Sequence, residues 1–599
     1  MPFQLSPGVT FTESDLTLIV PTIATTGGGM VGVFQWGPAH EIVQISSERD
    51  LAEKFGVPAY DATYARSWMV ASNFLKYGNN LKVVRHLGTD DKTATAEGTG
   101  TVLINSEDSY NLNRATVAAL DSDAGYCAKY AGELGNSLRV FVLDNTTEVT
   151  PTSTNLEASD DYFDLVGNFD GVPSTSVWAE TITGSTGMND EIHILVVDVG
   201  GMFTGVEGTI LEKYAFLSKA QNAKATDGTS NYYVDIINNK SAYVWWLKHP
   251  ENVQAGAGTE WGSVINGNTT ASFKLIDQPA ASGREDRKVS YTLGGGKTGG
   301  ITDATSIVTE ASVAAAYATH FENGGEVDVS LLLAGAMTAT NARAVIDVAD
   351  SRRDCIAFVS PQTDDVANIT TFDLQDALDY RTDLNISSSY AVLDSGYKLQ
   401  YDKYNDRYLY VPLCADVAGC CVRTDSTNDP WFSPAGFNRG TIKNVVRLAY
   451  NPGKADRDEL YKKGINPVVS FDGEGTVLFG DKTLLTRPSA FDRINVRRLF
   501  IVLEKAISTA SKFLLFEFND EFTRAQFKQL VEPYLREVQG RRGVTDFRVV
   551  CDESNNTPAV IDANGFVGDI YIKPNRSINF IQLNFIATPT GVSFEEIGA

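Results

Sequence analysis

Cysteine and histidine are scarce in this sequence. Its 599 residues include six cysteines and five histidines, and the histidines are dispersed along the chain. The closest cysteines, Cys414, Cys420 and Cys421, have no histidine cluster beside them, and no pair of cysteines has the spacing of a metal site or a disulfide framework. We therefore expect buried thiols in a reducing compartment and no metal site.

Long apolar runs and catalytic motifs are also missing. No run approaches the ~18 apolar residues that a membrane helix needs, and the opening MPFQLSPGVTF lacks the layout of a secretory signal. The stretch LGGGKTGG, residues 293–300, ends like a nucleotide-binding P-loop, but Tyr291 stands where that motif requires a glycine. The run at 27–29, GGG, lacks both P-loop and dinucleotide spacing and predicts a tight turn. We expect no catalytic residue, no cofactor and no membrane insertion.

Charge is abundant but unevenly distributed. The net charge is −25, which argues against direct nucleic-acid binding. Residues 485–599 hold 14 basic and 14 acidic side chains, so the whole excess of acid lies in the remaining 36 basic and 61 acidic residues. Within the neutral part, residues 487–548 carry 12 basic and 8 acidic side chains. An acidic body with a locally basic end predicts different faces for different partners.

Strand and helix patterns predict a multidomain α/β and α+β protein. Two separated stretches alternate strands with helices, which favours one central layered α/β domain. The sequence between them is rich in Ser, Thr, Asp and Gly and favours inserted β-rich outer domains, although LEKYAFLSKAQNA at 211–223 predicts a helix. The predicted parts are an N-terminal strand arm at 1–20, the central domain at 21–90 plus 326–484, inserted domains at 91–190 and 191–325, and a C-terminal α+β domain with a strand arm at 485–599.

The C-terminal domain opens with a two-faced helical pattern at 490–513. Val496, Leu499 and Leu503 share a wide apolar face, whereas Ile494 and Ile501 form a narrower stripe among charged residues. Such a helix either docks on a partner or is held between two parts of its own fold. A second helix follows, capped by Asn519, and then three strand patterns, DFRVVCD, FVGDIYIK and SINFIQLNFIA at 577–587.

One local motif is specific. The stretch DPWFSPAGFNRG, residues 429–440, is a Pro/Gly-rich turn that a buried tryptophan would fix. It resembles the motif P-W-x-A-P-A-G-x-x-R-G of contractile tail sheath proteins of T4-like bacteriophages, the myovirus tail sheath family. Ser433 departs from the family's alanine, and the resemblance extends from residue 326 to 599, more weakly over 1–90. The matching residues are Pro430, Trp431, Pro434, Ala435, Gly436, Arg439 and Gly440.

The resemblance implies a structural subunit of the virion tail that is assembled in the host cytoplasm. In that family, sheath subunits form hexameric rings that stack helically around a tail tube and contract without nucleotide, driving the tube through the host envelope. The implied partners are the chain itself, the tail tube protein, and baseplate and tail terminator proteins, with no direct nucleic-acid contact. Two alternatives from other classes stay open: an NTP-dependent motor that uses the GGGKT stretch, and a Ser/Thr-rich adhesin.

The resemblance also suggests which residues make contacts between subunits. Alternating strands at both ends would add to a neighbour's sheet, or pair within one subunit. The expected inter-subunit arm residues are Val9, Phe11, Val592 and Phe594, and those of the acceptor sheet are Ile581, Leu583 and Phe585. The expected tube-facing contacts are Arg493, Ile494, Arg497, Arg498, Ile501 and Lys505.

Overall fold

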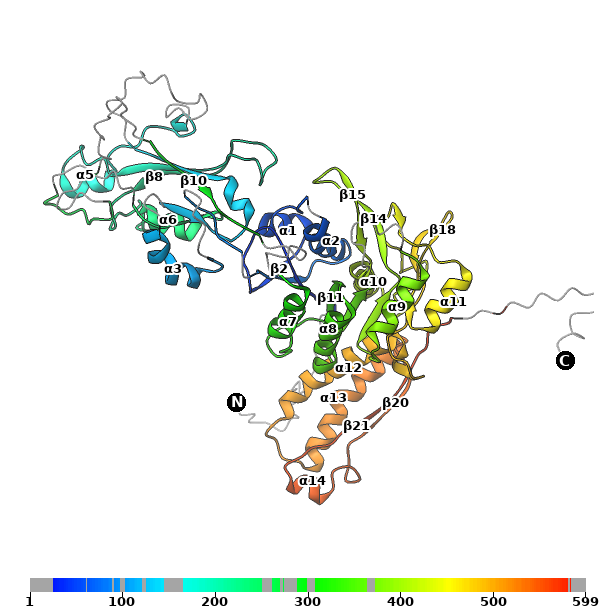
Figure 1. The fold of residues 1–599 in the computed structure, drawn as a ribbon. Coiled ribbons are helices and arrows are strands. Elements are labelled where there is room, and N and C mark those ends of the chain that lie inside the picture. Colours follow the sequence, from blue (N-terminus) through cyan, green and yellow to red (C-terminus); the bar gives the residue numbers. More distant parts are fainter. Residues whose placement is uncertain are drawn as a thin grey trace, which may run out of the picture.

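The computed structural model describes residues 25–60, 62–88, 91–96, 103–120, 125–144, 165–249, 261–269, 273, 288–298, 308–362, 372–579 and 582. Figure 1 shows three regions in space. The central module (25–88 and 308–484) lies in the middle, the insert (91–298) at one end, and the C-terminal module (485–579) at the opposite end. The predicted multidomain α/β and α+β class is confirmed.

Seven strands form one sheet in the central module. Their order is β17-β13-β12-β11-β1-β3-β2, and neighbours are parallel except β2, which runs antiparallel to β3. β1 pairs with β11, so the sheet joins stretches that lie about 300 residues apart. The strands are β1 (Gly28–Gly32), β2 (Ile42–Ile45), β3 (Leu81–Arg85), β11 (Leu331–Ala336), β12 (Ile356–Ser360), β13 (Ala391–Asp394) and β17 (Ile465–Asn466).

Helices cover both faces of this sheet. α1, α2 and α10 share one core with it, which includes Phe55, Trp68 and Val417, and α7, α8 and α9 share the other, around Tyr317 and Val345. Because both faces are covered, a strand such as β12 is buried and mostly apolar along its whole length. The helices are α1 (Glu48–Phe55), α2 (Ala62–Leu75), α7 (Glu310–Phe321), α8 (Ala339–Arg352), α9 (Leu374–Leu384), α10 (Cys414–Thr427) and α11 (Lys454–Lys462).

Two of the three glycines predicted to form a tight turn, Gly28 and Gly29, instead lie in strand β1. A Cβ at Gly28 would lie 2.7 Å from the ring of Phe74 in α2, and one at Gly29 would lie 3.1 Å from the ring of Phe321 in α7. The two glycines therefore let helices approach the sheet closely on both faces.

A second seven-stranded sheet forms the insert. Its order is β8-β7-β6-β10-β4-β5-β9, and its paired strands are antiparallel. Its core gathers Leu138, Ile194, Tyr233 and Trp246. Its strands are β4 (Thr95–Ala96), β5 (Tyr126–Ala128), β6 (Leu138–Leu143), β7 (Glu191–Asp198), β8 (Thr209–Ser218), β9 (Val244–Trp246) and β10 (Lys288–Gly294), accompanied by α3 (Glu107–Leu120), η1 (Glu133–Ser137), α5 (Val177–Thr183) and α6 (Tyr233–Lys240).

This sheet corrects two predictions about the insert. The boundary between 91–190 and 191–325 is wrong, because β6 pairs along its length with β7 and both blocks contribute to one core. The helix predicted at 211–223 is mostly strand β8. At the other end of the insert, α7 packs on the central sheet, so the central module resumes before residue 326.

Three smaller β elements complete the central module. A tyrosine-rich hairpin is formed by β14 (Tyr397–Asp402) and β15 (Arg407–Pro412), with Asp406 in the left-handed region at its turn (φ +48°). β16 (Arg447–Leu448) adds to that hairpin, and β18 (Val468–Phe471) pairs with β19 (Gly475–Leu478).

The C-terminal module packs two helices against a two-stranded ribbon, around Leu499, Phe527 and Val544. The cap of its second helix is Asp520, whose carboxylate accepts from the Thr523 N–H at 2.8 Å, and not Asn519 as predicted. Its elements are η3 (Ala490–Asp492), α12 (Ile494–Ser511), η4 (Lys512–Leu514), α13 (Glu521–Gly540), β20 (Val544–Val550), α14 (Pro558–Asp562) and β21 (Asp569–Pro574).

All six cysteines are free and buried, as the sequence predicts. Burial raises the pKa of the Cys355 and Cys421 thiols to about 12. A protonated, enclosed thiol is a small apolar filler and not a nucleophile.

Candidate assembly surfaces

The loop that carries the specific motif is fixed on all sides. Trp431 is only 8% exposed, and its indole Nε1 donates to the Arg541 carbonyl at 3.1 Å. Gly436 has a φ of +96°, its N–H donates to the Leu478 carbonyl at 2.9 Å, and Gly440 accepts from the Leu478 N–H at 2.8 Å. The predicted rigid turn, held by a buried tryptophan, is confirmed.

The same loop joins the central module to the C-terminal module. The Asn495 side chain in α12 donates to the Trp431 carbonyl at 3.3 Å. Ser433, which replaces the motif's alanine, donates to a carboxylate oxygen of Asp481 at 3.0 Å. Arg439 donates to the Ser433 carbonyl at 2.7 Å. The motif is therefore an internal joint between modules.

Two basic residues of α12 pair with acidic residues of the central module. Arg498 contacts both carboxylate oxygens of Asp425, at 2.7 and 2.5 Å, and donates to the Cys421 carbonyl at 3.3 Å. Burial alone would lower the pKa of Arg498, but the adjacent Asp425 carboxylate holds it above its ordinary value. Lys505 forms an ion pair with Asp328.

Arg493, which immediately precedes α12, and Arg497 within it are also engaged within the chain. Arg493 lies 2.8 Å from a carboxylate oxygen of Asp481. The Arg497 guanidinium stands 4.3 Å from the centroid of the Tyr390 ring and 3.4 Å from a carboxylate oxygen of Glu504. Burial raises the pKa of Glu504, and Arg497 opposes that rise.

The apolar residues of α12 belong to two different cores. Ile494 and Ile501 are 0% and 6% exposed and join the core of the central module, whereas Leu499 and Leu503 join the core of the C-terminal module. α12 is therefore held between two parts of its own fold. Of the residues predicted to contact the tube, four are buried within the subunit, namely Ile494, Arg497, Arg498 and Ile501. Arg493 and Lys505 are half-buried and form ion pairs within the chain.

The segment after α12 has the opposite character. Four large apolar side chains between α12 and α13, and a fifth in the first turn of α13, are 63% or more exposed, and Phe516 is fully exposed with a left-handed φ of +71°. A bulky residue in that region is strained, which often marks a functional surface. We call these residues the aromatic tip: Phe513, Leu515, Phe516, Phe518 and Phe522. Sequence reasoning missed them, although KFLLFEF is a conspicuous apolar run.

The Gly-rich stretch at 293–298 has a structural role. Gly296 donates its N–H to the Asn136 side chain at 2.7 Å, and Lys297 donates its N–H to the Lys92 carbonyl at 3.1 Å. The Thr298 hydroxyl accepts from the Glu133 N–H at 3.0 Å. A phosphate cradle needs backbone N–H groups that are free to point at the ligand, and these two are occupied.

A buried arginine ties the insert to the central module. Arg85 is 0% exposed and donates to the carbonyls of Phe34, Gly37 and Ala131, at 2.9, 2.7 and 2.7 Å. Ala131 belongs to the insert, so one guanidinium spans the junction. Burial lowers the pKa of Arg85 to about 10, so it stays protonated at neutral pH.

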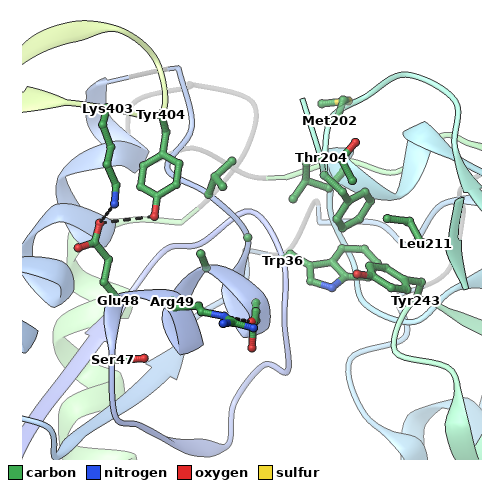
Figure 2. A pocket seen from close by; sticks show the side chains of 16 residues that line it. Trp36, Ser47, Glu48, Arg49, Met202, Thr204, Leu211, Tyr243, Lys403 and Tyr404 are labelled. Atoms are coloured by element: carbon green, nitrogen blue, oxygen red, sulfur yellow. Dashed lines mark hydrogen bonds and ion pairs between the residues drawn. The ribbon is translucent and has the colours of Figure 1, made fainter. Parts of the chain in front are cut away.

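Beside this junction, a cleft of about 670 Å³ separates α1 from the insert (Figure 2). Trp36, Leu211 and Tyr243 line one side, and Glu48 and Arg49 of α1 line the other. The Glu48 carboxylate pairs with Lys403 and accepts a hydrogen bond from the Tyr404 hydroxyl, both in the turn of the β14–β15 hairpin, so its charge is satisfied. No cysteine or histidine is among the residues that line the cleft.

Several predicted residues lie outside the described part of the chain. They are Val9, Phe11, Ile581, Leu583, Phe585, Val592 and Phe594. Within the described residues, no group of three or more potential ligands is placed to hold a metal ion. No helix in that part of the chain is long and apolar enough to cross a membrane.

Comparison with known proteins decides the family. A model of the phage tail sheath protein central domain matches residues 310–484, a model of the phage tail sheath C-terminal domain matches 486–588, and one of the tail sheath protein Gp18 domain III N-terminal region matches 28–85. The tail sheath protein of Vibrio phage KVP40 is 36% identical over 99% of both chains. The chain belongs to the phage tail sheath protein family.

Other sheath proteins extend this picture. The tail sheath protein of Enterobacteria phage T4 is 34% identical over 99% of both chains. A crystal structure of the sheath tail protein from Desulfitobacterium hafniense matches with a TM-score of 0.49 and 14% identity, over 91% of this chain and 94% of that one. As a member of the phage tail sheath protein family, this chain is a structural component of a phage tail. The central-domain match begins at the first residue of α7, in agreement with the packing of that helix on the central sheet.

Proposed function

We propose that this sheath protein assembles as hexameric rings, stacked helically around a tail tube, that contract without nucleotide and drive the tube through the host envelope. The observation that carries the proposal is the aromatic tip, a large apolar surface at the end of the molecule opposite the acidic insert. Soluble proteins rarely leave such a patch uncovered unless a partner binds it. The occupied N–H groups of Gly296 and Lys297 favour this reading over a nucleotide-driven motor.

The aromatic tip is the tube contact in this proposal. It replaces the basic face of α12, whose charges are engaged inside the subunit. The insert then lies outside, where its exposed loops favour solubility. The proposal includes assembly in the host cytoplasm, together with baseplate and tail terminator proteins at the two ends of the stack.

Strand exchange connects neighbouring subunits in this proposal. The described ribbon of β20 and β21 has only two strands, and such a ribbon offers edges to which a further strand can add. Acceptor residues Ile581, Leu583 and Phe585 would extend it, and the arms with Val9, Phe11, Val592 and Phe594 would come from neighbours. Main-chain hydrogen bonds of this kind survive changes in side-chain packing, so subunits stay connected while they rearrange.

Contraction is then a rigid-body rearrangement of subunits between two packings. The described joints favour rigid modules, because the motif loop and the ion pair between Arg498 and Asp425 hold the C-terminal module on the central module. The expected change lies between subunits, in the contacts of the aromatic tip and of the arms.

The test is assembly of the purified full-length protein. At high concentration, negative-stain microscopy should show tubes built of stacked six-fold rings, with and without ATP. A protein that stays monomeric at all concentrations, or that needs a nucleotide to change length, contradicts the proposal.

Tube contact is tested with the variant Phe516→Ser/Phe518→Ser. We expect it to form ring-stacked tubes alone, but to lose co-sedimentation with preassembled tail tubes. The matched control is Tyr401→Ser/Tyr408→Ser, which removes two exposed aromatic side chains from the β14–β15 hairpin. Equal tube binding by both variants would remove the aromatic tip from the tube interface.

A further inference from the structure

A basic groove of about 840 Å³ lies where the motif loop, α11 and the chain that leaves β21 meet. Five basic side chains line it, and none forms an ion pair with a carboxylate among the described residues. Its two acidic residues are Asp458 and Asp481, and Asp481 is already paired with Arg493. The groove therefore carries excess positive charge, from Arg439, Lys454, Arg457, Arg542 and Arg576.

Apolar side chains lie among these charges. Phe479 and Ile578 line the groove and are 43% and 81% exposed. The Arg457 guanidinium stands 5.6 Å from the centroid of the Phe479 ring, which holds a cation beside an open aromatic surface. This combination fits an extended peptide that carries both an aromatic anchor and carboxylates.

One wall of the groove is the chain itself, on its way out of the C-terminal module. The Ser577 hydroxyl donates to Asp481 at 2.8 Å, and the Asn579 side-chain amide lies 2.7 Å from the Tyr461 hydroxyl. These contacts fix the wall without filling the groove, because Ile578 between them stays exposed.

We propose that this groove binds the segment Gly591–Ala599 of a second copy of the chain. Its sequence, GVSFEEIGA, supplies one aromatic residue, Phe594, followed directly by Glu595 and Glu596. Phe594 packs beside Phe479 and Ile578, and the two carboxylates pair with the unpaired cations. This proposal rests on the proposed exchange of arms between subunits and names where the end of one arm is held.

The length of the chain favours a second copy if residues 577–587 form the extended strand that their sequence predicts. Eight extended residues after Asn579 would span about 26 Å. The seven residues from there to Phe594 would span about 23 Å, and reversing direction would use at least two of them, too few to bring the chain's own Phe594 back to Phe479.

The experiment measures binding of a labelled synthetic peptide of residues 588–599 to dilute, monomeric full-length protein by fluorescence polarisation. We expect saturable binding that weakens as salt rises. The variant Lys454→Glu/Arg457→Glu should weaken it about tenfold or more, since two facing charges are reversed. A peptide with Phe594→Ala should bind several-fold more weakly than the parent.

The matched control is Lys462→Glu/Lys463→Glu, which makes the same charge change at exposed positions at the end of α11, outside the groove. It should leave peptide binding unchanged. Equal weakening by both pairs of substitutions would mean non-specific attraction and overturn the proposal. So would equally tight binding of a peptide of residues 5–16, which also combines an aromatic residue with carboxylates.

Two further outcomes separate this proposal from the proposed function. The peptide could bind the full-length variant Phe594→Ser but not the unmodified protein. That result would mean that the chain's own segment already fills the groove, and the second-copy assignment fails. If no peptide binds, but Lys454→Glu/Arg457→Glu still assembles into ring-stacked tubes, the groove assignment fails while the sheath function stands. Loss of tubes in that variant alone, with the control intact, supports both.

Discussion

Helix α12 and the aromatic tip that follows it are neighbours in sequence and opposites in environment. In α12, the basic side chains and the second apolar stripe find partners in the same chain, 73 residues away for Arg498 and 177 residues away for Lys505. In the tip, large apolar side chains are exposed among the described residues. A two-faced helix is therefore no sign of an external partner, because a second module of the same chain supplies the same complementarity.

The largest effect should come from removing the buried ion pair of α12. Arg498→Ala leaves the Asp425 carboxylate, 4% exposed, without its partner, so we expect a loss of about 3–5 kcal/mol in the free energy of unfolding. Urea denaturation measures it. Arg536→Ala, at an exposed position of α13, is the control and should change stability by less than about 0.5 kcal/mol.

A second variant separates the ion pair from general damage to the helix. The double change Arg498→Met/Asp425→Leu removes both charges together and should recover much of the loss. If Arg498→Ala instead matched its control, the account of α12 as an internal joint would be wrong.

The apolar stripe of α12 should show the next effect. Ile494→Ala empties a fully buried position in the core of the central module, with an expected cost of about 2–5 kcal/mol. Thermal unfolding of the full-length protein measures it. The same substitution at Ile578, which is 81% exposed, should cost less than about 0.5 kcal/mol. Similar costs at both sites would contradict the contrast between buried and open surfaces.

A smaller effect is expected for the outermost basic residue of α12. Lys505 pairs with Asp328, whose side chain is 55% exposed, so Lys505→Ala should cost no more than about 1 kcal/mol. The loss should shrink further in high salt, because screening weakens an exposed pair. A loss of stability above about 1 kcal/mol that does not change with salt would mean that Lys505, like Arg498, forms a buried ion pair.

The smallest effect on stability should come from the aromatic tip. Phe516→Ser/Phe518→Ser should change the free energy of unfolding by less than about 0.5 kcal/mol, because both residues are highly exposed. Urea denaturation measures the stability of this variant, and the co-sedimentation assay measures its binding to tail tubes. A large loss of stability would show that the tip has partners within its own chain.

Much of the central module could be predicted because its signals are local. The β14–β15 hairpin has alternating tyrosines and an Asn405-Asp406 turn, and the strands and helices from 331 to 394 are set by short apolar runs and caps. These signals act over a few residues, so they survive in any tertiary context.

Other features were hidden because distant residues decide them. The sequence predicts a helix where strand β8 lies. Register shifts opposite Ile192–Ile194 and Val196–Val197 interrupt the alternation of buried and exposed side chains by which strands are recognised. The strand needs a glycine at position 28 because the ring of Phe74 approaches it closely, and no local pattern shows this. The charged face of α12 turns toward the central module for a similar reason, because Asp425 and Asp328 of that module pair with Arg498 and Lys505.

One measurement tests the central contrast directly: hydroxyl-radical footprinting, read by mass spectrometry, of the free subunit and of the sheath assembled on its tube. Phe516 and Phe518 should be reactive in the free subunit and protected several-fold on assembly, whereas Ile494 and Ile501 should be protected equally in both states. Protection of Ile494 and Ile501 that appears only on assembly, with the aromatic tip still reactive, would contradict the account.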